Sequence, residues 1–142
     1  KTRFDSVKNG FQALDPCDFV WIHDGARPIV PQELIDRLLN SSNFNAAIPI
    51  IPLTDTIKEV ENNIVKKTVN RDVLYRVQTP QLFNYTLLNK AYETIHDPSV
   101  TDEAMLIEKL DETIHTIHGS TLNIKLTTPE DLPFIESLLS PK

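Results

Sequence analysis

Short apolar runs alternate with segments of helical periodicity along this chain. The apolar run within residues 18–24 lies between Pro16 and the turn at 25–28, and it predicts a strand buried on both faces. Residues 3–14 place apolar side chains three and four positions apart, which predicts an amphipathic helix. The same reasoning predicts helices at 31–39, 84–96, 101–110 and 128–139, and strands at 46–51, 113–117 and 122–126. This alternation favours an α/β fold with a mostly parallel sheet.

Three of these helices carry recognisable start signals. Asn84 is expected as the N-cap of one helix and Thr101 as the cap of the next, with Asp102 and Glu103 in its first turn, where the helix dipole favours acids. The last helix is expected to open at Thr128, because a capping residue is followed by proline and then acids.

Residues 54–69 have a different texture, with scattered Ile and Val among Lys and Glu and a turn signal at Glu61-Asn62-Asn63. This pattern predicts a polar β-hairpin that the core covers only weakly. An isolated two-stranded hairpin is marginally stable in water. We therefore expect the hairpin to project and to pack on a partner chain.

Composition narrows the functional classes. The 142 residues suit one domain, and 14 Lys+Arg against 20 Asp+Glu give a net charge of −6. An acidic chain with no long apolar segment does not suit a general nucleic-acid binder or a membrane protein. The single cysteine, Cys17, excludes an internal disulfide and fits a reducing compartment, so a cytoplasmic location is expected. Three glycines leave no glycine-rich phosphate loop within the chain.

The densest chemical signal follows the first buried strand, at His23-Asp24-Gly25-Ala26-Arg27-Pro28. Ligands of such sheets bind beyond the carboxyl ends of the strands. Asp24 could ligate a hard cation such as Mg²⁺, and the forked donors of Arg27 match a phosphate. The alternative is an ion pair between Asp24 and Arg27 within the turn, with no ligand. His23 is expected to be a structural hydrogen-bonding residue that points away from Asp24.

A second signal is basic. Residues 58–76 contain five basic and three acidic side chains, a local excess of positive charge in an acidic chain. Lys66 and Lys67 suit the edge of a solvated hairpin, whereas Arg71 is a candidate anion ligand. Lys125 stands on an otherwise apolar predicted strand, so it must pair, face a cleft or reach past the strand edge.

Six segments, taken in order, resemble one family closely: 2-C-methyl-D-erythritol 4-phosphate cytidylyltransferase of non-mevalonate isoprenoid synthesis. The matching segments are RFDSVKNG (3–10), HDGARP (23–28), DTIK (55–58), RDVLYRVQTPQLF (71–83), TDEAMLIEKL (101–110) and NIKLTTPEDL (123–132). The resemblance implies a Rossmann-like fold of the nucleotide-diphospho-sugar transferase type. It also implies transfer of a cytidylyl group from CTP to methylerythritol phosphate with Mg²⁺, and a homodimer formed through the hairpin arm.

The resemblance also implies roles for particular residues. Arg71 and Lys125 would hold the acceptor phosphate for attack on the α-phosphorus of CTP. Thr56 on the arm and Thr79 would contact the acceptor, and Ser6 would contact cytosine. Asp24 and Arg27 would lie beside the acceptor and the metal-bound triphosphate.

The family's Gly-rich loop, with its Arg and Lys, has no counterpart here. We therefore expect residues 1–142 to be the C-terminal two-thirds of a single cytidylyltransferase domain, with residues 54–69 as its dimerisation arm, and to be inactive alone. Alternatives are a ribitol 5-phosphate cytidylyltransferase, a non-catalytic dimerisation or ligand-binding module, or one half of a bifunctional protein.

Overall fold

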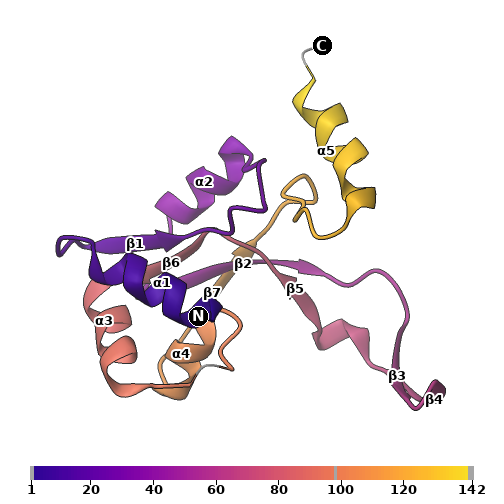
Figure 1. The fold of residues 1–142 in the computed structure, drawn as a ribbon, viewed down its shortest axis with the longest axis horizontal. Coiled ribbons are helices and arrows are strands. Elements are labelled where there is room, and N and C mark those ends of the chain that lie inside the picture. Colours follow the sequence, from indigo (N-terminus) through magenta and orange to yellow (C-terminus); the bar gives the residue numbers. More distant parts are fainter. Residues whose placement is uncertain (1, 98, 141–142) are drawn as a thin grey trace.

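The computed structural model describes residues 2–97 and 99–140. A five-stranded sheet forms the centre of the molecule, helices cover both of its faces, and a hairpin projects from one end (Figure 1). The sheet strands are β1 (Phe19–Ile22), β2 (Ala46–Pro52), β5 (Tyr75–Val77), β6 (Gln81–Asn84) and β7 (His115–His118). The helices are α1 (Arg3–Gln12), α2 (Gln32–Leu39), α3 (Tyr85–Thr94), α4 (Ala104–Lys109) and α5 (Leu132–Leu139), with 3₁₀ turns η1 (Arg71–Val73) and η2 (Pro129–Asp131).

The α/β class is confirmed, but the expectation of a mostly parallel sheet needs correction. The strand order is β1-β6-β2-β5, with β7 on the other edge of β2. Among the described pairings of this five-stranded sheet, only β2 and β7 pair in parallel, and the other three are antiparallel. The difference arises from β5 and β6, two short strands that the apolar pattern did not predict and that run against β1, β2 and β7.

The strands β5 and β6 follow one another along the same edge of β2, and residues 78–80 bridge the gap between them. Phe83 pairs with Ala46 near the start of β2, whereas Val77 pairs with Ile50 near its end. In the gap, the amide of Gln78 donates to the carbonyl of Pro49 at 2.8 Å, so the bridge stays attached to β2. This bridge is where most of the candidate site is built.

The prediction of a strand at 122–126 is wrong. These residues form a turn and an irregular segment that crosses the strand ends instead of pairing with the sheet. The amide of Asn123 donates to Ser120, and the amide of Leu126 donates to the carbonyl of Ala26 at 2.7 Å. The segment is therefore held against the loop after β1, which places Lys125 over the site.

The two faces of the sheet have separate cores that follow strict alternation along each strand. One face packs on α1, α3 and α4, and the other packs on α2 (Figure 1). The first core includes Phe4, Phe11, Val20, Ile22, Ala46, Ile48, Phe83, Leu88 and Tyr92. The second includes Leu34, Leu38, Ala47 and Leu82, with Phe19 and Trp21 against it.

The helix starts were predicted with mixed success. Asn84 caps α3 as expected, since its Oδ1 accepts from the amide of Leu87 at 3.1 Å. Thr101 does not cap α4. The carboxylate of Asp102 accepts from the amide of Met105 at 3.2 Å instead. Thr128 forms a capping box, but a 3₁₀ turn precedes α5.

The hairpin arm, strands β3 (Ile57–Glu61) and β4 (Ile64–Val69), forms a separate two-stranded sheet as expected. Asn62 and Asn63 both have positive φ, 49° and 61°, which is the geometry of a two-residue hairpin turn. Lys66 and Lys67 pair with Glu61 and Glu59 on the exposed surface. No helix in the described part of the chain is long and apolar enough to cross a membrane.

Candidate active site at the strand ends

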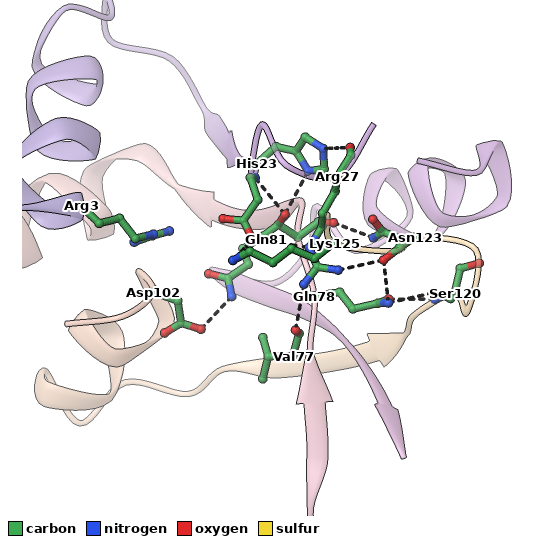
Figure 2. Close-up of polar contacts among 12 residues, drawn as sticks. Arg3, His23, Arg27, Val77, Gln78, Gln81, Asp102, Ser120, Asn123 and Lys125 are labelled. Atoms are coloured by element: carbon green, nitrogen blue, oxygen red, sulfur yellow. Dashed lines mark hydrogen bonds and ion pairs between the residues drawn. The ribbon is translucent and has the colours of Figure 1, made fainter. Parts of the chain in front are cut away.

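Two adjoining cavities open where the loop after β1, the bridge at 78–80 and the segment at 120–127 converge. The larger has a volume of about 520 Å³ and the smaller about 170 Å³. Their common wall consists of Arg27, Val77, Gln78 and Lys125. Figure 2 shows these side chains converging from separate parts of the chain.

Asp24 is the central anion of this site. Its Oδ2 lies 3.1 Å from the ammonium of Lys125 and 3.4 Å from Nε of Arg27. Burial alone would raise the pKa of Asp24. The hydrogen bond and charge of Lys125, with further help from Arg27 and Arg3, outweigh that effect and hold the pKa below its ordinary value. Asp24 is therefore a carboxylate at neutral pH.

Arg27 is committed mainly to backbone carbonyls. Its NH1 donates to the carbonyl of Asn123 at 2.8 Å and its NH2 to that of Val77 at 3.5 Å. The ion pair with Asp24, which was the alternative to phosphate binding, is present. Arg27 thus joins three segments of the site, and its role as a phosphate ligand stays a prediction.

Thr79 and His23 fix the loop that carries Asp24. The buried hydroxyl of Thr79 accepts from the amide of Asp24 at 3.0 Å and lies 3.0 Å from Nδ1 of His23. The other ring nitrogen, Nε2, lies 2.9 Å from the carbonyl of Arg27. Because a carbonyl only accepts, Nε2 carries the proton of the neutral ring, and the Thr79 hydroxyl donates to Nδ1. The structural role expected for His23 is confirmed.

The side chains of Gln78 and Asn123 hold the common wall in place through hydrogen bonds to neighbouring segments. The Gln78 amide bonds the backbone of Ser120 through both of its ends, and it also donates to the carbonyl of Asn123 at 3.2 Å. The side chain of Asn123 donates to the carbonyl of Thr79 at 2.7 Å. Gly119 is required beside them, because a Cβ there would lie 2.3 Å from Oε1 of Gln78.

Lys125 belongs to an irregular segment and not to the predicted strand, yet it both pairs and faces a cleft. Its side chain is 45% exposed, lines both cavities and reaches Asp24. A lysine ammonium is a compact charge on a flexible stem, so Lys125 can turn from Asp24 toward an anion in either cavity.

A buried carboxylate lies behind the smaller cavity. Glu103 is fully buried and accepts two hydrogen bonds from the guanidinium of Arg3, at 3.0 and 2.9 Å, and one from the hydroxyl of Tyr92 at 3.2 Å. Burial would lower the pKa of Arg3, but its bonds to Glu103 raise it. The pKa of Tyr92 is raised by its burial beside Glu103. This cluster ties α1 to the start of α4.

The remaining predicted site residues lie elsewhere in the single chain. Arg71 and Thr56 line a separate cavity of about 380 Å³ at the base of the arm, and Arg71 donates to the carbonyl of Thr54. Ser6 is exposed on α1 and lines neither strand-end cavity. Within one chain, therefore, Arg71 and Lys125 are not brought together.

The donor set around Asp24 fits a magnesium ion only in part. No cluster of three or more His, Cys, Asp or Glu side chains that could hold a metal occurs within 2–97 and 99–140. Magnesium is commonly bound by one or two carboxylates together with substrate phosphates, and Asp24 could be such a carboxylate. A phosphorylated substrate would then supply the other oxygen ligands.

The strand ends of this α/β sheet thus present the carboxylate of Asp24 between two cationic side chains, at the edge where such sheets bind ligands. The family model for 2-C-methyl-D-erythritol 4-phosphate cytidylyltransferase matches residues 1–140. The chain belongs to this family.

Curated relatives and solved structures agree with the family match. The enzyme of this name from Clostridioides difficile is 41% identical over 99% of the chain, and that from Alkaliphilus oremlandii is 44% identical over 96%. A crystal structure of the Thermus thermophilus enzyme has a TM-score of 0.86 at 31% identity, covering 96% of this chain and 68% of that one. The chain spans 61% of the length of the C. difficile relative and 60% of the A. oremlandii one.

Sequence reasoning missed the residues that build the site's frame. Gln78, Gln81, Asn123 and Glu103 are all nearly or fully buried polar residues. Buried Gln and Asn are uncommon without partners, but no sequence pattern marks which residues are buried in irregular segments. The sequence signal at Glu103 was an acidic residue directly before an apolar helix. Such a residue is equally compatible with an exposed position in the first turn of that helix.

Proposed function

We propose that this chain is part of a cytidylyltransferase that transfers the cytidylyl group of CTP to 2-C-methyl-D-erythritol 4-phosphate and releases pyrophosphate. The family match supports the reaction class and both substrates. The observation that carries the proposal for the site is the position of Lys125. It matches the family's lysine for the acceptor phosphate, and it lies on the wall common to both strand-end cavities.

The chemistry this arrangement would perform is positioning with charge stabilisation. The attacking group is an oxygen of the acceptor phosphate, which is already anionic, so no general base is needed to activate it. Two phosphate groups must approach one another, and cationic side chains offset their repulsion. Lys125 would leave Asp24 to bind the acceptor phosphate, while Thr79 and Asp24 would lie beside the acceptor.

We also propose a homodimer in which the arm of one subunit completes the site of the other. Arg71 and Thr56 line the cavity at the base of the projecting arm, whereas Lys125 lines the two strand-end cavities. If the arm of one subunit reaches the strand-end site of the other, Arg71 would meet the acceptor phosphate beside Lys125 of the partner subunit. Ser6, exposed on α1, would contact cytosine.

Magnesium would be held by Asp24 and the triphosphate, and it would supply charge neutralisation at the phosphates when bound. When no magnesium ion is bound, Asp24 would orient Lys125 through their contact at 3.1 Å. A cytoplasmic location is proposed as well, on the basis of the single free cysteine, Cys17.

The direct test uses the full gene product with CTP, magnesium and methylerythritol phosphate, and it measures pyrophosphate release. Release with this acceptor and not with ribitol 5-phosphate supports the proposal. The converse result would assign the chain to the ribitol branch, and no release with either would reject the activity.

The role of Arg71 has its own test. Arg71→Ala should lower kcat/KM for the acceptor roughly 10²-fold, the scale of a lost preorganised donor, while the Kd of CTP stays within about twofold. Lys66→Ala, an exposed arm residue paired with Glu61, is the matched control and should change neither value. Equal losses in acceptor use and CTP binding after Arg71→Ala would contradict the assigned role.

A further inference from the structure

Two buried glutamines, three residues apart beside the site, differ in how their amides are paired. Both ends of the Gln78 amide are bonded to backbone groups of the 120–123 segment. Gln81 is 1% exposed, and its Nε2 donates to Oδ2 of Asp102 at 2.9 Å. Its Oε1 is buried and has no hydrogen-bond partner among the described residues.

The orientation of the Gln81 amide follows from its partner. An ionised carboxylate only accepts hydrogen bonds, so the amide nitrogen must face Asp102 and the unpaired atom is the oxygen. A buried amide oxygen without a donor loses the hydrogen bonds it would make with water and is therefore unfavourable. An acceptor of this kind is satisfied by a donor that comes from outside the chain.

The surroundings indicate which donor fits. Gln81 lines the smaller cavity together with Asp24, Arg27 and Lys125. Figure 2 shows it reaching toward Asp102, with Arg3 on one side and Lys125 on the other. Nε of Arg27, in the wall of the same cavity, is a buried donor that also lacks a hydrogen bond, although Asp24 lies 3.4 Å away.

An unpaired acceptor and an unpaired donor in one small cavity select for hydroxyl groups. A hydroxyl both donates and accepts, so a polyol can satisfy Gln81 Oε1 and Arg27 Nε together. The dianion of a phosphate monoester offers only acceptors and cannot satisfy Gln81. The cations of the site thus suit the phosphate of a ligand, whereas Gln81 suits its alcohol portion.

We propose that Gln81 is a specificity-determining residue of the acceptor site, whose amide oxygen accepts a hydrogen bond from a hydroxyl group of the polyol phosphate. This inference rests on the function proposed above. It assigns recognition of the polyol to a residue distinct from those that bind the phosphate.

The test measures Kd by calorimetry at about pH 8 for methylerythritol phosphate and for methyl phosphate, a monoester dianion without a hydroxyl group, with the full gene product. Wild type should bind the polyol phosphate more tightly. Gln81→Met should reduce that preference roughly tenfold, the value of one neutral hydrogen bond, and leave the Kd of methyl phosphate within about twofold. Gln32→Met is the matched control, since the amide of Gln32 also donates to an aspartate, Asp36, but lies exposed on α2, and it should retain the preference.

Each outcome bears on a different statement. If wild type binds both ligands equally, the proposed acceptor is wrong, and this inference falls with it. If wild type prefers the polyol phosphate and Gln81→Met keeps that preference, only the role of Gln81 is wrong. An equal loss of preference in Gln32→Met would likewise overturn it, because the effect would then not arise from the amide that faces the cavity.

A measurement on wild type covers the case in which Gln81→Met does not fold. The side-chain amide resonances of Gln81 are followed by NMR during titration with each ligand. Methylerythritol phosphate should shift them, and methyl phosphate at matched saturation should not. Identical shifts from the two ligands would overturn the proposal.

Discussion

The strand-end site and the arm differ in what holds their side chains in place. At the strand ends, Arg27, Gln78 and Asn123 form bonds that span 42 to 96 residues of sequence. In the arm, side-chain bonds and ion pairs join residues of the hairpin or its base, such as Lys67 with Glu59 and Arg71 with Thr54. Contacts between distant parts of the chain thus fix the first region, whereas these contacts of the second are local to the arm and its base.

The largest expected effect concerns the frame of the strand-end site. Arg3→Leu should lower the free energy of unfolding by roughly 3–5 kcal/mol, because it leaves the fully buried Glu103 without its ion pair. Adding Glu103→Leu should restore most of that loss. Denaturant unfolding of the single and double variants checks this. A loss under about 1 kcal/mol for the single variant would mean that this end of the molecule is as loosely held as the arm.

The next effect tests whether the two regions meet across subunits. Arg71→Met and Lys125→Met should each reduce cytidylyl transfer roughly 10²-fold, because each removes one of the two cations proposed to hold the acceptor phosphate. Subunits of the two variants, mixed and allowed to exchange, should recover roughly a quarter of wild-type activity, because half of the dimers then contain one intact composite site.

Two controls sharpen this experiment. Each variant mixed with itself should stay inactive. A mixture that recovers no activity, although the exchanged dimers form, would show that Arg71 and Lys125 do not act in one composite site.

The smallest effect is a pH dependence that only the strand-end site should show. The pKa of Asp24 is lowered in the folded chain, so its contribution to stability is complete above the ordinary aspartate pKa of about 3.9 and is lost as pH falls toward the folded value. The difference in unfolding free energy between wild type and Asp24→Asn should thus be constant at about pH 5–7 and shrink below about pH 4.

The arm supplies the control for this profile. Lys67→Gln removes an exposed pair with Glu59 and should change stability by less than about 1 kcal/mol at every pH. If the stability difference for Asp24→Asn were also independent of pH, the two regions would not differ in how their charged groups contribute to stability.

The sequence predicted these two regions unequally. The arm was predicted well, because alternation and the Asn62-Asn63 turn are local signals, and both asparagines have positive φ in the structure. The buried strands β1, β2 and β7 were also found, since continuous apolar runs mark them. Asp24 and Lys125 were predicted as site residues from their side-chain chemistry and from the family resemblance. Their contact at 3.1 Å is consistent with a shared site.

The rest was set by long-range contacts that leave no local pattern. β5 is a strand because β2 offers it an edge, and β6 is a strand because it lies between β1 and β2. Each is too short for its own periodicity to be distinctive. The segment at 122–126 has the alternation of a strand, but its backbone bonds run to Ala26 and Ser120 instead of a ladder. The same holds for Glu103, whose partner Arg3 is 100 positions away.

Gly119 gives the strand-end site a constraint that originates outside its walls. Its φ is not in the left-handed region, so crowding is what excludes a side chain there: a methyl group would meet the Gln78 amide oxygen and would lie 3.1 Å from the Ile50 carbonyl. Even one added carbon would push on Gln78, then on Asn123, and through it on Arg27. A single position that lines neither cavity could therefore change the shape of both cavities when it is substituted, in evolution or in the laboratory.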